Sequence, residues 1–262
     1  KSVLEHFTNS ADTVSARADR EVDAYYLANY WDVIDLQYHV DYPGEDPMSR
    51  NNPGPASSRA GNLGVGQVPY AVIDGGAEGQ FRYDFSGIEH IPDSSDLQLK
   101  SLESPLFSIE LDAQWDENSV SLITDVTCQA AQYSEYVHLY IVVFETLVTA
   151  YTWGNGDTEF RNVVLKMLPT PAGKLLSDSW TRGDKNTVAA DWTFEPYVED
   201  SEDLGVVVFL QDRSSRQILQ AAVSYASPQT SVWDTREEFA DLALYPNPAT
   251  DRIYVNTGTP AS

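Results

Sequence analysis

Residues 2–40 show two kinds of pattern in their apolar and polar residues, one typical of strands and one typical of a helix. The stretch SVLEHFT (2–8) is an apolar run typical of a buried strand. From about Ala11 to Tyr30, apolar residues recur four positions apart, with Asp and Arg between them. This spacing predicts an amphipathic helix, because residues four apart share one helix face. VIDLQYHV (33–40) then predicts a second strand.

Turn-forming residues separate the elements that follow. The Pro, Gly and Asn content of DYPGEDPMSRNNPGP (41–55) predicts a loop, and a short helix follows at about Ala56 to Leu63. VPYAVIDG (68–75) and GQFRYDF (79–85) are joined by a Gly-rich turn and therefore predict a hairpin. The leucines of segment 93–103 predict a last helix.

The resulting order of elements is β-α-β-α-β-β-α. A helix connects the first two strands, which makes them parallel neighbours, whereas the two hairpin strands are antiparallel. This order is the thioredoxin-like arrangement. We therefore predict an α/β thioredoxin-like domain over residues 1–103.

After Ser104 the pattern changes, and apolar residues recur at every second position. FSIELDAQW (107–115) and SVSLITDVTCQA (119–130) each place their apolar residues on one face. Five further segments continue the pattern, at 137–148, 159–168, 187–194, 204–212 and 217–225. Seven such strands predict an all-β, Ig-like antiparallel sandwich over residues 104–227. A linker is expected at 228–240, and residues 241–262 begin another unit.

Charge and cysteine content narrow the function classes. The 262 residues hold 16 Lys and Arg against 40 Asp and Glu, a net charge of −24, which excludes nucleic acid and anionic membranes as partners. No apolar run reaches the length of a membrane span. Cys128 is the one cysteine, so an intramolecular disulfide, a CxxC pair and a zinc ribbon are all impossible. We expect Cys128 to be buried in the sandwich.

Several short motifs carry a resemblance to a known family. The segments EHFTN (5–9), YH (38–39), VPY (68–70) and DG (74–75) resemble the thioredoxin-like outer-membrane-protein family of Bacteroidota. The segments VVFET (142–146), FRNVVLKMLPTPAG (160–173) and VVVFLQD (206–212) resemble its second domain. In the tail, LYPNPATDRIYVN (244–256) closely resembles the start of the C-terminal sorting domain of type IX secretion cargo, with its motif at Tyr245, Pro246, Asn247 and Pro248.

The chain departs from this family at the redox site. The family's CxxC should fall on residues 12–15, where Asp12 and Ser15 replace both cysteines. Thiol exchange needs an attacking thiolate and a resolving thiol, so oxidoreductase activity at this site is excluded. A carboxylate at the start of a helix instead accepts hydrogen bonds from free N–H groups, for about 0.5–2 kcal/mol of stability. We therefore predict that Asp12 caps the helix and that the redox site is degenerate.

Two other places could bind a ligand. By resemblance, Pro69 stands at the family's cis-proline, so that Asp12, Val68, Pro69 and Tyr70 could form a peptide-docking groove. The alternative, which we favour, is that the cis bond only shapes the fold. His6 and His39 lie near the ends of two neighbouring strands and could bind a metal ion together with Asp12 or Asp41.

A histidine at a strand end is more often simply hydrogen-bonded, so we expect no metal ion and no cofactor. Residues 155–159 and 199–205 lack the ligand spacing of a calcium loop. GxSxG, HExxH and Walker motifs are absent from the sequence.

These observations favour a non-catalytic binding or structural protein. By resemblance it is extracellular or on the cell surface, exported by the type IX secretion machinery, and part of or accessory to an outer-membrane protein assembly through a protein partner. Because Lys1 opens directly onto a strand, we expect a mature chain that has lost its export signal. The alternatives are a peptide- or carbohydrate-binding protein with its groove beside Pro69, and a metal-dependent enzyme around His6 and His39.

Overall fold

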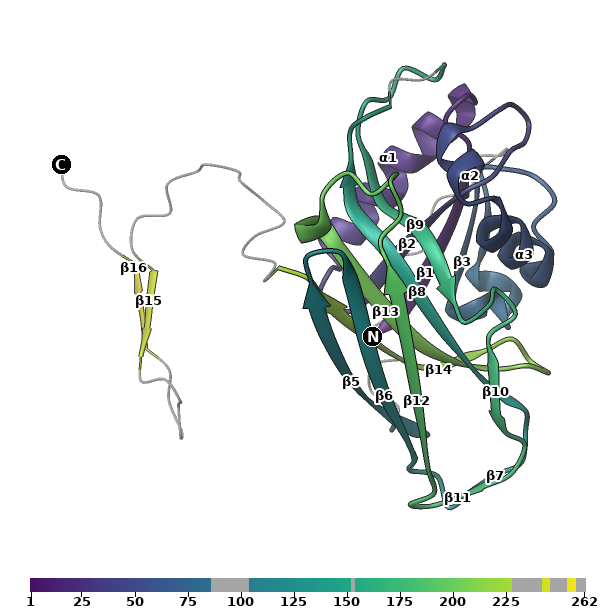
Figure 1. Ribbon diagram of the computed structural model, residues 1–262, viewed down its shortest axis with the longest axis vertical. Coiled ribbons are helices and arrows are strands. Elements are labelled where there is room, and N and C mark those ends of the chain that lie inside the picture. Colours follow the sequence, from purple (N-terminus) through teal and green to yellow (C-terminus); the bar gives the residue numbers. More distant parts are fainter. Residues whose placement is uncertain (86–103, 152–153, 228–241, 246–253, 258–262) are drawn as a thin grey trace. The chain divides into compact units, whose positions relative to one another are not determined.

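The computed structural model describes residues 1–85, 104–151, 154–227, 242–245 and 254–257 (Figure 1). Residues Lys1–Pro228 form one compact unit, and Gln229–Ser262 form a second. The predicted linker at 228–240 therefore begins where the first unit ends, although its residues lie outside the described part of the chain.

The predicted β-α-β-α-β-β order is present in the first 85 residues. The elements are β1 (Ser2–Thr8), α1 (Thr13–Ala28), β2 (Val33–His39), α2 (Pro47–Asn51), α3 (Pro53–Leu63), β3 (Tyr70–Ile73) and β4 (Arg82–Asp84), with 3₁₀ turns η1 (Asp74–Gly76) and η2 (Gly79–Phe81). β1 and β2 are parallel, and β3 and β4 are antiparallel, as predicted. The helix predicted at 93–103 falls outside the described residues.

The loop predicted at 41–55 is partly wrong. α2 begins at Pro47, and α3 begins at Pro53 rather than near Ala56. Proline suits the first position of a helix, where its missing N–H group is not needed. Asp46 also caps α2, because its side chain accepts hydrogen bonds from the backbone N–H groups of Met48 and Ser49. The prolines that predicted a loop therefore mark helix starts.

All seven strands predicted after Ser104 are present. They are β5 (Phe107–Asp116), β6 (Ser119–Cys128), β8 (Val137–Val148), β9 (Phe160–Leu168), β12 (Lys185–Thr193), β13 (Leu204–Asp212) and β14 (Ile218–Tyr225). Three short strands were not predicted, β7 (Gln132–Tyr133), β10 (Lys174–Ser177) and β11 (Trp180–Thr181), nor was the 3₁₀ turn η3 (Ser201–Asp203). β12, β6 and β5 form a separate three-stranded antiparallel sheet.

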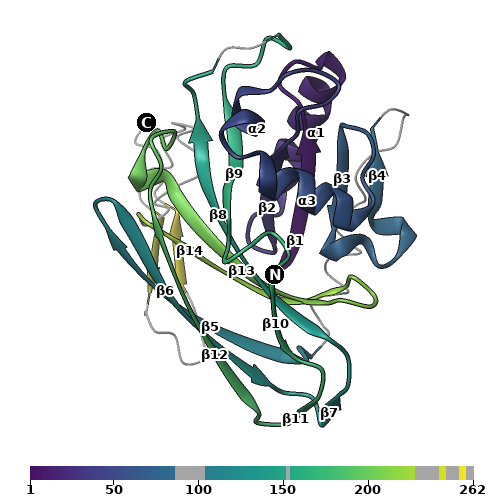
Figure 2. The same ribbon diagram turned by 45° about the vertical axis from the view of Figure 1, so that its right-hand side comes forward.

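One mixed sheet joins the two halves of the first unit (Figure 2). Its strand order is β14-β13-β8-β9-β2-β1-β3-β4, with β10 added beside β8. The junction is a parallel pairing of β2 with β9, at Gln37 and Val163. The boundary predicted between residues 103 and 104 therefore does not separate two units, because strands from both sides of it share this sheet.

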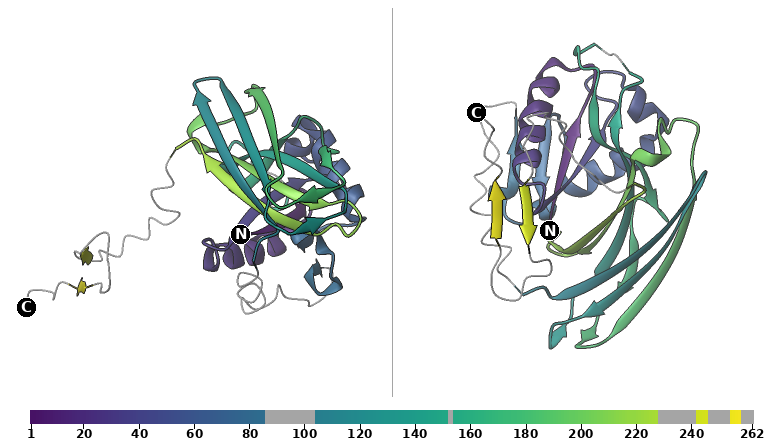
Figure 3. Two further views of the ribbon diagram at one scale, coloured as in Figure 1. Left: turned by 90° about the horizontal axis from the view of Figure 1, so that it is seen from below. Right: turned by 90° about the vertical axis from the view of Figure 1, so that its left-hand side faces the viewer.

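Apolar residues pack on both faces of the strands from the second half. On β8, Leu139, Ile141 and Val143 face a core shared with the three-stranded sheet, where Cys128 is also buried as predicted. Tyr140, Val142 and Phe144 face a second core with residues of β1, β2 and α3. Residues 139–144 of β8 are thus an uninterrupted apolar run because both faces of the strand are covered. Figure 3 shows the three-stranded layer and the helices from two further sides.

A buried ion pair lies in the second core. The Arg59 guanidinium of α3 donates to both carboxylate oxygens of Glu5 on β1, at 2.6 and 2.7 Å, and also to Gln211 Oε1 on β13, at 2.8 Å. The guanidinium also lies over the rings of Tyr140 and Phe209, 4.9 and 5.1 Å from their centroids. Arg59 therefore connects β1 with the strands of the second half.

The second unit contains an antiparallel hairpin of β15 (Leu242–Tyr245) and β16 (Tyr254–Thr257). Tyr245 is the last residue of β15 and pairs with Tyr254. Pro246, Asn247 and Pro248, the rest of the predicted sorting motif, lie outside the described residues. Among the described residues, no helix is long and apolar enough to cross a membrane.

Candidate functional site

The start of α1 is capped as predicted. The Asp12 carboxylate accepts hydrogen bonds from Val14 N at 3.4 Å, Ser15 N at 2.9 Å and Ser15 Oγ at 2.9 Å. Ser15 is fully buried. Asp12 and Ser15, the two positions predicted to be degenerate redox positions, therefore bond to each other and to free N–H groups of the helix start.

Two connections cover the backbone just before Asp12. The backbone of Ser10 donates to Asp46 Oδ2 at 2.7 Å and accepts from Asn155 N at 3.1 Å. Asn9 donates to the carbonyls of Val40 and Gly44, both at 2.7 Å. Asn9 and Ser10 are consequently fully buried. The segment 154–157, between β8 and β9, was not linked to this site by any sequence signal.

The predicted docking residues lie beside the end of β1. The Val68–Pro69 peptide is cis, and Tyr70 pairs with Phe7. Val68 and Tyr70 are half-buried and pack against the second core, which includes Phe7. This packing is what the fold-shaping interpretation requires. The docking interpretation stays a prediction.

His6 and His39 each pair with a different carboxylate. His6 Nε2 lies 3.1 Å from Asp19 Oδ1, and His39 Nδ1 lies 2.9 Å from Asp46 Oδ2. His39 Nε2 also lies 3.0 Å from Gln37 Oε1. Asp12 and Asp41, the predicted additional ligands, are not the partners of either ring. In the part of the chain that the structure describes, no three His, Cys, Asp or Glu side chains are grouped to hold a metal ion.

Several acidic groups are buried near His6. Burial raises the pKa of Asp35 to about 7, even though Asn162 donates to its carboxylate at 3.0 Å. Burial likewise raises the pKa of Asp23 to about 6. Burial lowers the pKa of His6, but the charge and hydrogen bond of Asp19 outweigh this effect, so the pKa is raised. Asp35 therefore titrates near neutral pH in this region.

A further cavity lies elsewhere, where the α2–α3 junction meets the end of β9. Its volume is about 500 Å³. We call it the proline-rimmed groove, and its lining residues are Asn51, Asn52, Pro53, Gly54, Pro55, Lys166, Met167, Pro169, Thr170, Pro171, Glu195 and Tyr197. The prolines give it rigid apolar walls, and Lys166, Glu195 and the two asparagines add polar contacts. Such mixed, concave surfaces are typical of ligand sites.

Two buried polar atoms beneath this groove lack a partner among the described residues. They are Asn52 Nδ2 and Glu145 Oε2. Glu145, Asn51, Asn52 and Tyr197 line a smaller cavity of about 10 Å³ that shares its asparagines and tyrosine with the groove. Burial raises the pKa of Glu145 to about 7, although the backbone N–H groups of Asp200 and Glu199 donate to its other oxygen. A buried polar atom of this kind needs a hydrogen-bond partner from water or from a ligand.

The sequence did not predict this groove. Its walls come from residues 51–55, 166–171 and 195–197, which are far apart in the chain. The one available signal was the pair of proline-containing segments NNPGP (51–55) and LPTP (168–171), which were assigned to a loop and a strand end. Their proximity depends on the pairing of β2 with β9, which periodicity alone cannot reveal.

Comparisons with known proteins identify the fold. No protein-family model and no curated protein matches the chain. Among solved structures, HBP35 of Porphyromonas gingivalis is 15% identical, with a TM-score of 0.65 over 98% of this chain and 84% of that chain. A domain of the outer membrane lipoprotein Omp28 from the same species is 12% identical, with a TM-score of 0.34 over 48% of this chain and 92% of that chain.

A DUF3823 family protein from Bacteroides ovatus is 15% identical, with a TM-score of 0.27 over 47% of this chain and 57% of that chain. The similar structures thus include proteins of Bacteroidota, the group of bacteria named by the sequence resemblance. At 15% identity, the likeness to HBP35 shows that the two chains share a fold.

Proposed function

We propose that this chain is a non-catalytic binding protein of the bacterial cell surface, whose proline-rimmed groove holds a segment of a partner protein. The groove itself carries this proposal. It is about 500 Å³ in volume, and its lining combines prolines, Tyr197 and Met167 with a few polar side chains. Aromatic residues and methionine are enriched at protein interfaces, and rigid prolines lose little freedom when a partner is bound.

An unsatisfied amide supports a ligand of peptide character. Asn52 lines the groove, and its amide can donate to a backbone carbonyl. Lys166 and Glu195 provide opposite charges on the lining. An extended segment offers carbonyl and N–H groups at regular spacing, which such a lining can satisfy.

The proposal that the protein is non-catalytic rests on the degenerate redox position. Asp12 and Ser15 form a helix cap there, and the neighbouring backbone is covered by residues 41–46 and 154–157. The same covering makes a peptide groove beside Pro69 less favourable than the proline-rimmed groove. A metal-dependent enzyme at His6 and His39 would need ligands to converge, whereas these rings pair with separate carboxylates.

The proposed location and export route rest on the resemblance. We assign residues 1–103 to a thioredoxin-like region fused to an Ig-like sandwich, and residues 241–262 to the start of a type IX sorting domain. The described β15–β16 hairpin falls within that tail. The shared fold with HBP35 of Porphyromonas gingivalis supports the resemblance to proteins of Bacteroidota. The protein would then act at the cell surface as a subunit or accessory of an outer-membrane assembly.

A substitution that fills the groove tests the binding proposal. Gly54 lines the groove, and a Cβ atom added there meets no atom within 4 Å. We expect Gly54→Trp to leave the fold intact and to block the groove. The measurement is native isolation of the tagged protein from the source cell surface, followed by mass spectrometry of what copurifies. Wild type is expected to retain a stoichiometric partner that Gly54→Trp loses.

Gly61→Trp is the matched control. Gly61 is exposed on the same helix, has equal space for a Cβ atom and does not line the groove. We expect it to retain the partner. If both variants retain the partner, or if wild type is isolated as a lone chain, the proposed role of the groove is wrong.

A further inference from the structure

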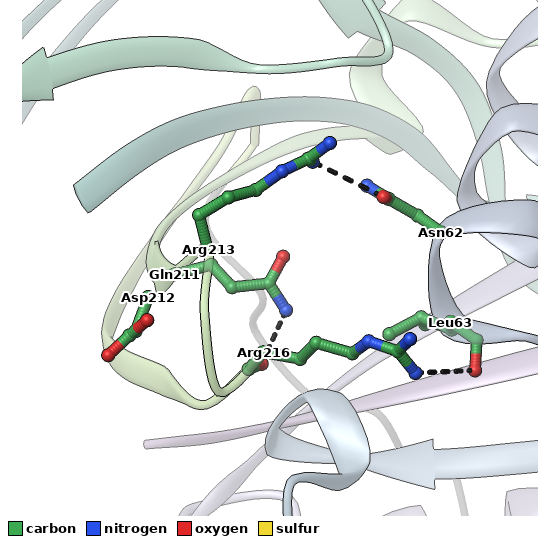
Figure 4. A pocket seen from close by; sticks show the side chains of 6 residues that line it. All are labelled: Asn62, Leu63, Gln211, Asp212, Arg213 and Arg216. Atoms are coloured by element: carbon green, nitrogen blue, oxygen red, sulfur yellow. Dashed lines mark hydrogen bonds between the residues drawn. The ribbon is translucent and has the colours of Figure 1, made fainter. Parts of the chain in front are cut away.

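A second cavity lies at the opposite end of α3 from Gly54. It is about 190 Å³ in volume and lies between the C-terminal end of α3 and the turn that joins β13 to β14 (Figure 4). Its lining residues are Asn62, Leu63, Gln211, Asp212, Arg213 and Arg216. Two of the chain's few basic residues therefore share one small cavity, although acidic residues outnumber basic ones by 40 to 16.

The β13–β14 turn fixes where both arginines begin. Asp212 Oδ1 accepts hydrogen bonds from Ser214 N at 2.7 Å and Ser215 N at 3.1 Å, and Arg216 N donates to Asp212 O at 2.9 Å. Asp212 Oδ2 accepts from Tyr133 Oη at 2.8 Å. One oxygen of this carboxylate is thus bound within the turn and the other by β7. Figure 4 shows the carboxylate pointing away from the two guanidinium groups.

Both guanidinium groups extend toward the end of α3. Arg213 Nη1 donates to Asn62 Oδ1 at 3.2 Å, and Arg216 Nη1 lies 3.5 Å from Leu63 O. Neither arginine has an ion-pair partner among the described residues. A guanidinium has five N–H donors, so most of the donors in this cavity are free to bind a ligand.

The bottom of the cavity is a built polar surface. The buried Gln211 amide, 4% exposed, accepts from Arg59 and donates to Arg216 O. Arg82 also donates to Leu63 O, at 2.8 Å. The charge of Arg59 is matched by Glu5. The one carboxylate of the lining, Asp212, is bound by Ser214, Ser215 and Tyr133 and points away from the guanidinium groups of Arg213 and Arg216 (Figure 4). The cavity is therefore a local cationic site on an acidic protein.

We propose that this cavity binds one small oxyanion group, a carboxylate or a phosphate, held between Arg213 and Arg216. Planar guanidinium groups bind such groups through paired charge-assisted hydrogen bonds. The Asn62 amide can supply a further donor. The small volume admits a single anionic group, and the net charge of −24 repels an extended polyanion.

The test is a titration of the full chain with inorganic phosphate, followed by NMR. His138 on β8 provides a reporter, because it pairs with Gln211 across the sheet. Burial and the charge of Arg213 lower the pKa of His138. An anion that offsets this charge is expected to raise that pKa and to shift the signals of Arg213, Arg216 and Asn62. Binding should weaken as salt is added.

Substitutions assign the effect to the two arginines. We expect Arg213→Gln and Arg216→Gln each to weaken phosphate binding by about tenfold or more, since each removes a charge-assisted hydrogen bond. Arg182→Gln is the matched control, because Arg182 is also exposed but bonds to Gln129 O on a different turn. Thermal unfolding of each variant must show an intact fold.

The probes also distinguish the source of the anion. We expect acetate to compete with phosphate. If the anion is carried on a ligand, a short peptide with a free C-terminal carboxylate should also compete, and the same peptide with an amidated C-terminus should not. Competition by phosphate and acetate alone would assign the site to free anions. If phosphate shifts none of these signals, or if Arg182→Gln weakens binding as much as the cavity variants do, the proposal is wrong.

Discussion

Asp12 shows how the chemistry of a single position determines what a fold can do there. A thiolate and a carboxylate both gain from the positive end of a helix, but only the thiolate can exchange a disulfide. Asp12 accepts from the backbone of Val14 and Ser15 and from the Ser15 hydroxyl. The carboxylate of Asp12 therefore stabilises the helix start and offers no thiol chemistry there.

Removing this cap should lower stability without exposing a new surface. We expect Asp12→Ala to reduce the free energy of unfolding by about 0.5–2 kcal/mol, because the N–H groups of Val14 and Ser15 lose their acceptor. Asp12→Asn should retain most of the stability, since asparagine caps about as well as aspartate. Urea unfolding followed by circular dichroism measures both. Equal losses for the two variants would show that charge, rather than capping, matters at this position.

Short elements were the hardest to predict, and they form the candidate sites. α2 has five residues, and its sequence PMSRN has no apolar periodicity to detect. The turn between β13 and β14 likewise consists of polar residues, so Arg213 and Arg216 resembled ordinary loop residues. Strands such as β6 and β13 were predicted because their side chains alternate or are apolar throughout. Both cavities are lined in part by segments with no such signal.

The hairpin of β15 and β16 leads to a prediction about export of the protein. If β15 and β16 begin a sorting domain, deletion of residues 241–262 should leave the first unit folded but abolish its appearance at the cell surface. Fractionation with an antibody to the first unit measures this, with accumulation in the periplasm as the expected result. A substitution confined to residues 229–235 is the control. Normal surface display of the truncated chain would contradict the proposed export route.

Buried acids give the whole molecule an unusual pH dependence. Burial raises the pKa values of Asp35 and Glu145 to about 7 and of Asp23 to about 6, so the folded protein holds protons that the unfolded chain releases near pH 4. These groups therefore lower stability as the pH rises from about 4 to 7. For Asp46, burial is outweighed by the charge and hydrogen bond of His39, and the pKa falls to about 2. The lowered pKa means that ionised Asp46 stabilises the fold, and this contribution is lost as the pH falls below about 4.

We expect Asp35→Asn to reduce the fall in the free energy of unfolding between about pH 4 and pH 7. The asparagine needs no proton and can still accept from Asn162. Asp178→Asn, at an exposed position, should leave the pH profile unchanged. Denaturant unfolding at several pH values gives the profiles. A parallel shift of the whole curve, with no change in slope, would mean that Asp35 is ionised in the folded protein.

Local signals predicted most strands and the first helix, whereas the way the halves join was not predictable. The pattern of SVLEHFT and VIDLQYHV identified β1 and β2, and the crossover helix made them parallel. Nothing in either strand identifies β9 as the next neighbour of β2, because sheet partners are selected by long-range packing. We predicted two domains because each half of the chain has its own spacing of apolar residues and the pairing of β2 with β9 leaves no mark in that spacing.

The pairing of β2 with β9 has a consequence for biogenesis. Residues 40–159 separate the two strands, so they must all be synthesised and delivered before the sheet can close at its centre. A chain emerging from a ribosome or a translocation channel therefore presents the open edge of β2 throughout that interval. Open strand edges pair readily with other chains. We expect the nascent protein to depend on a periplasmic chaperone until β9 arrives.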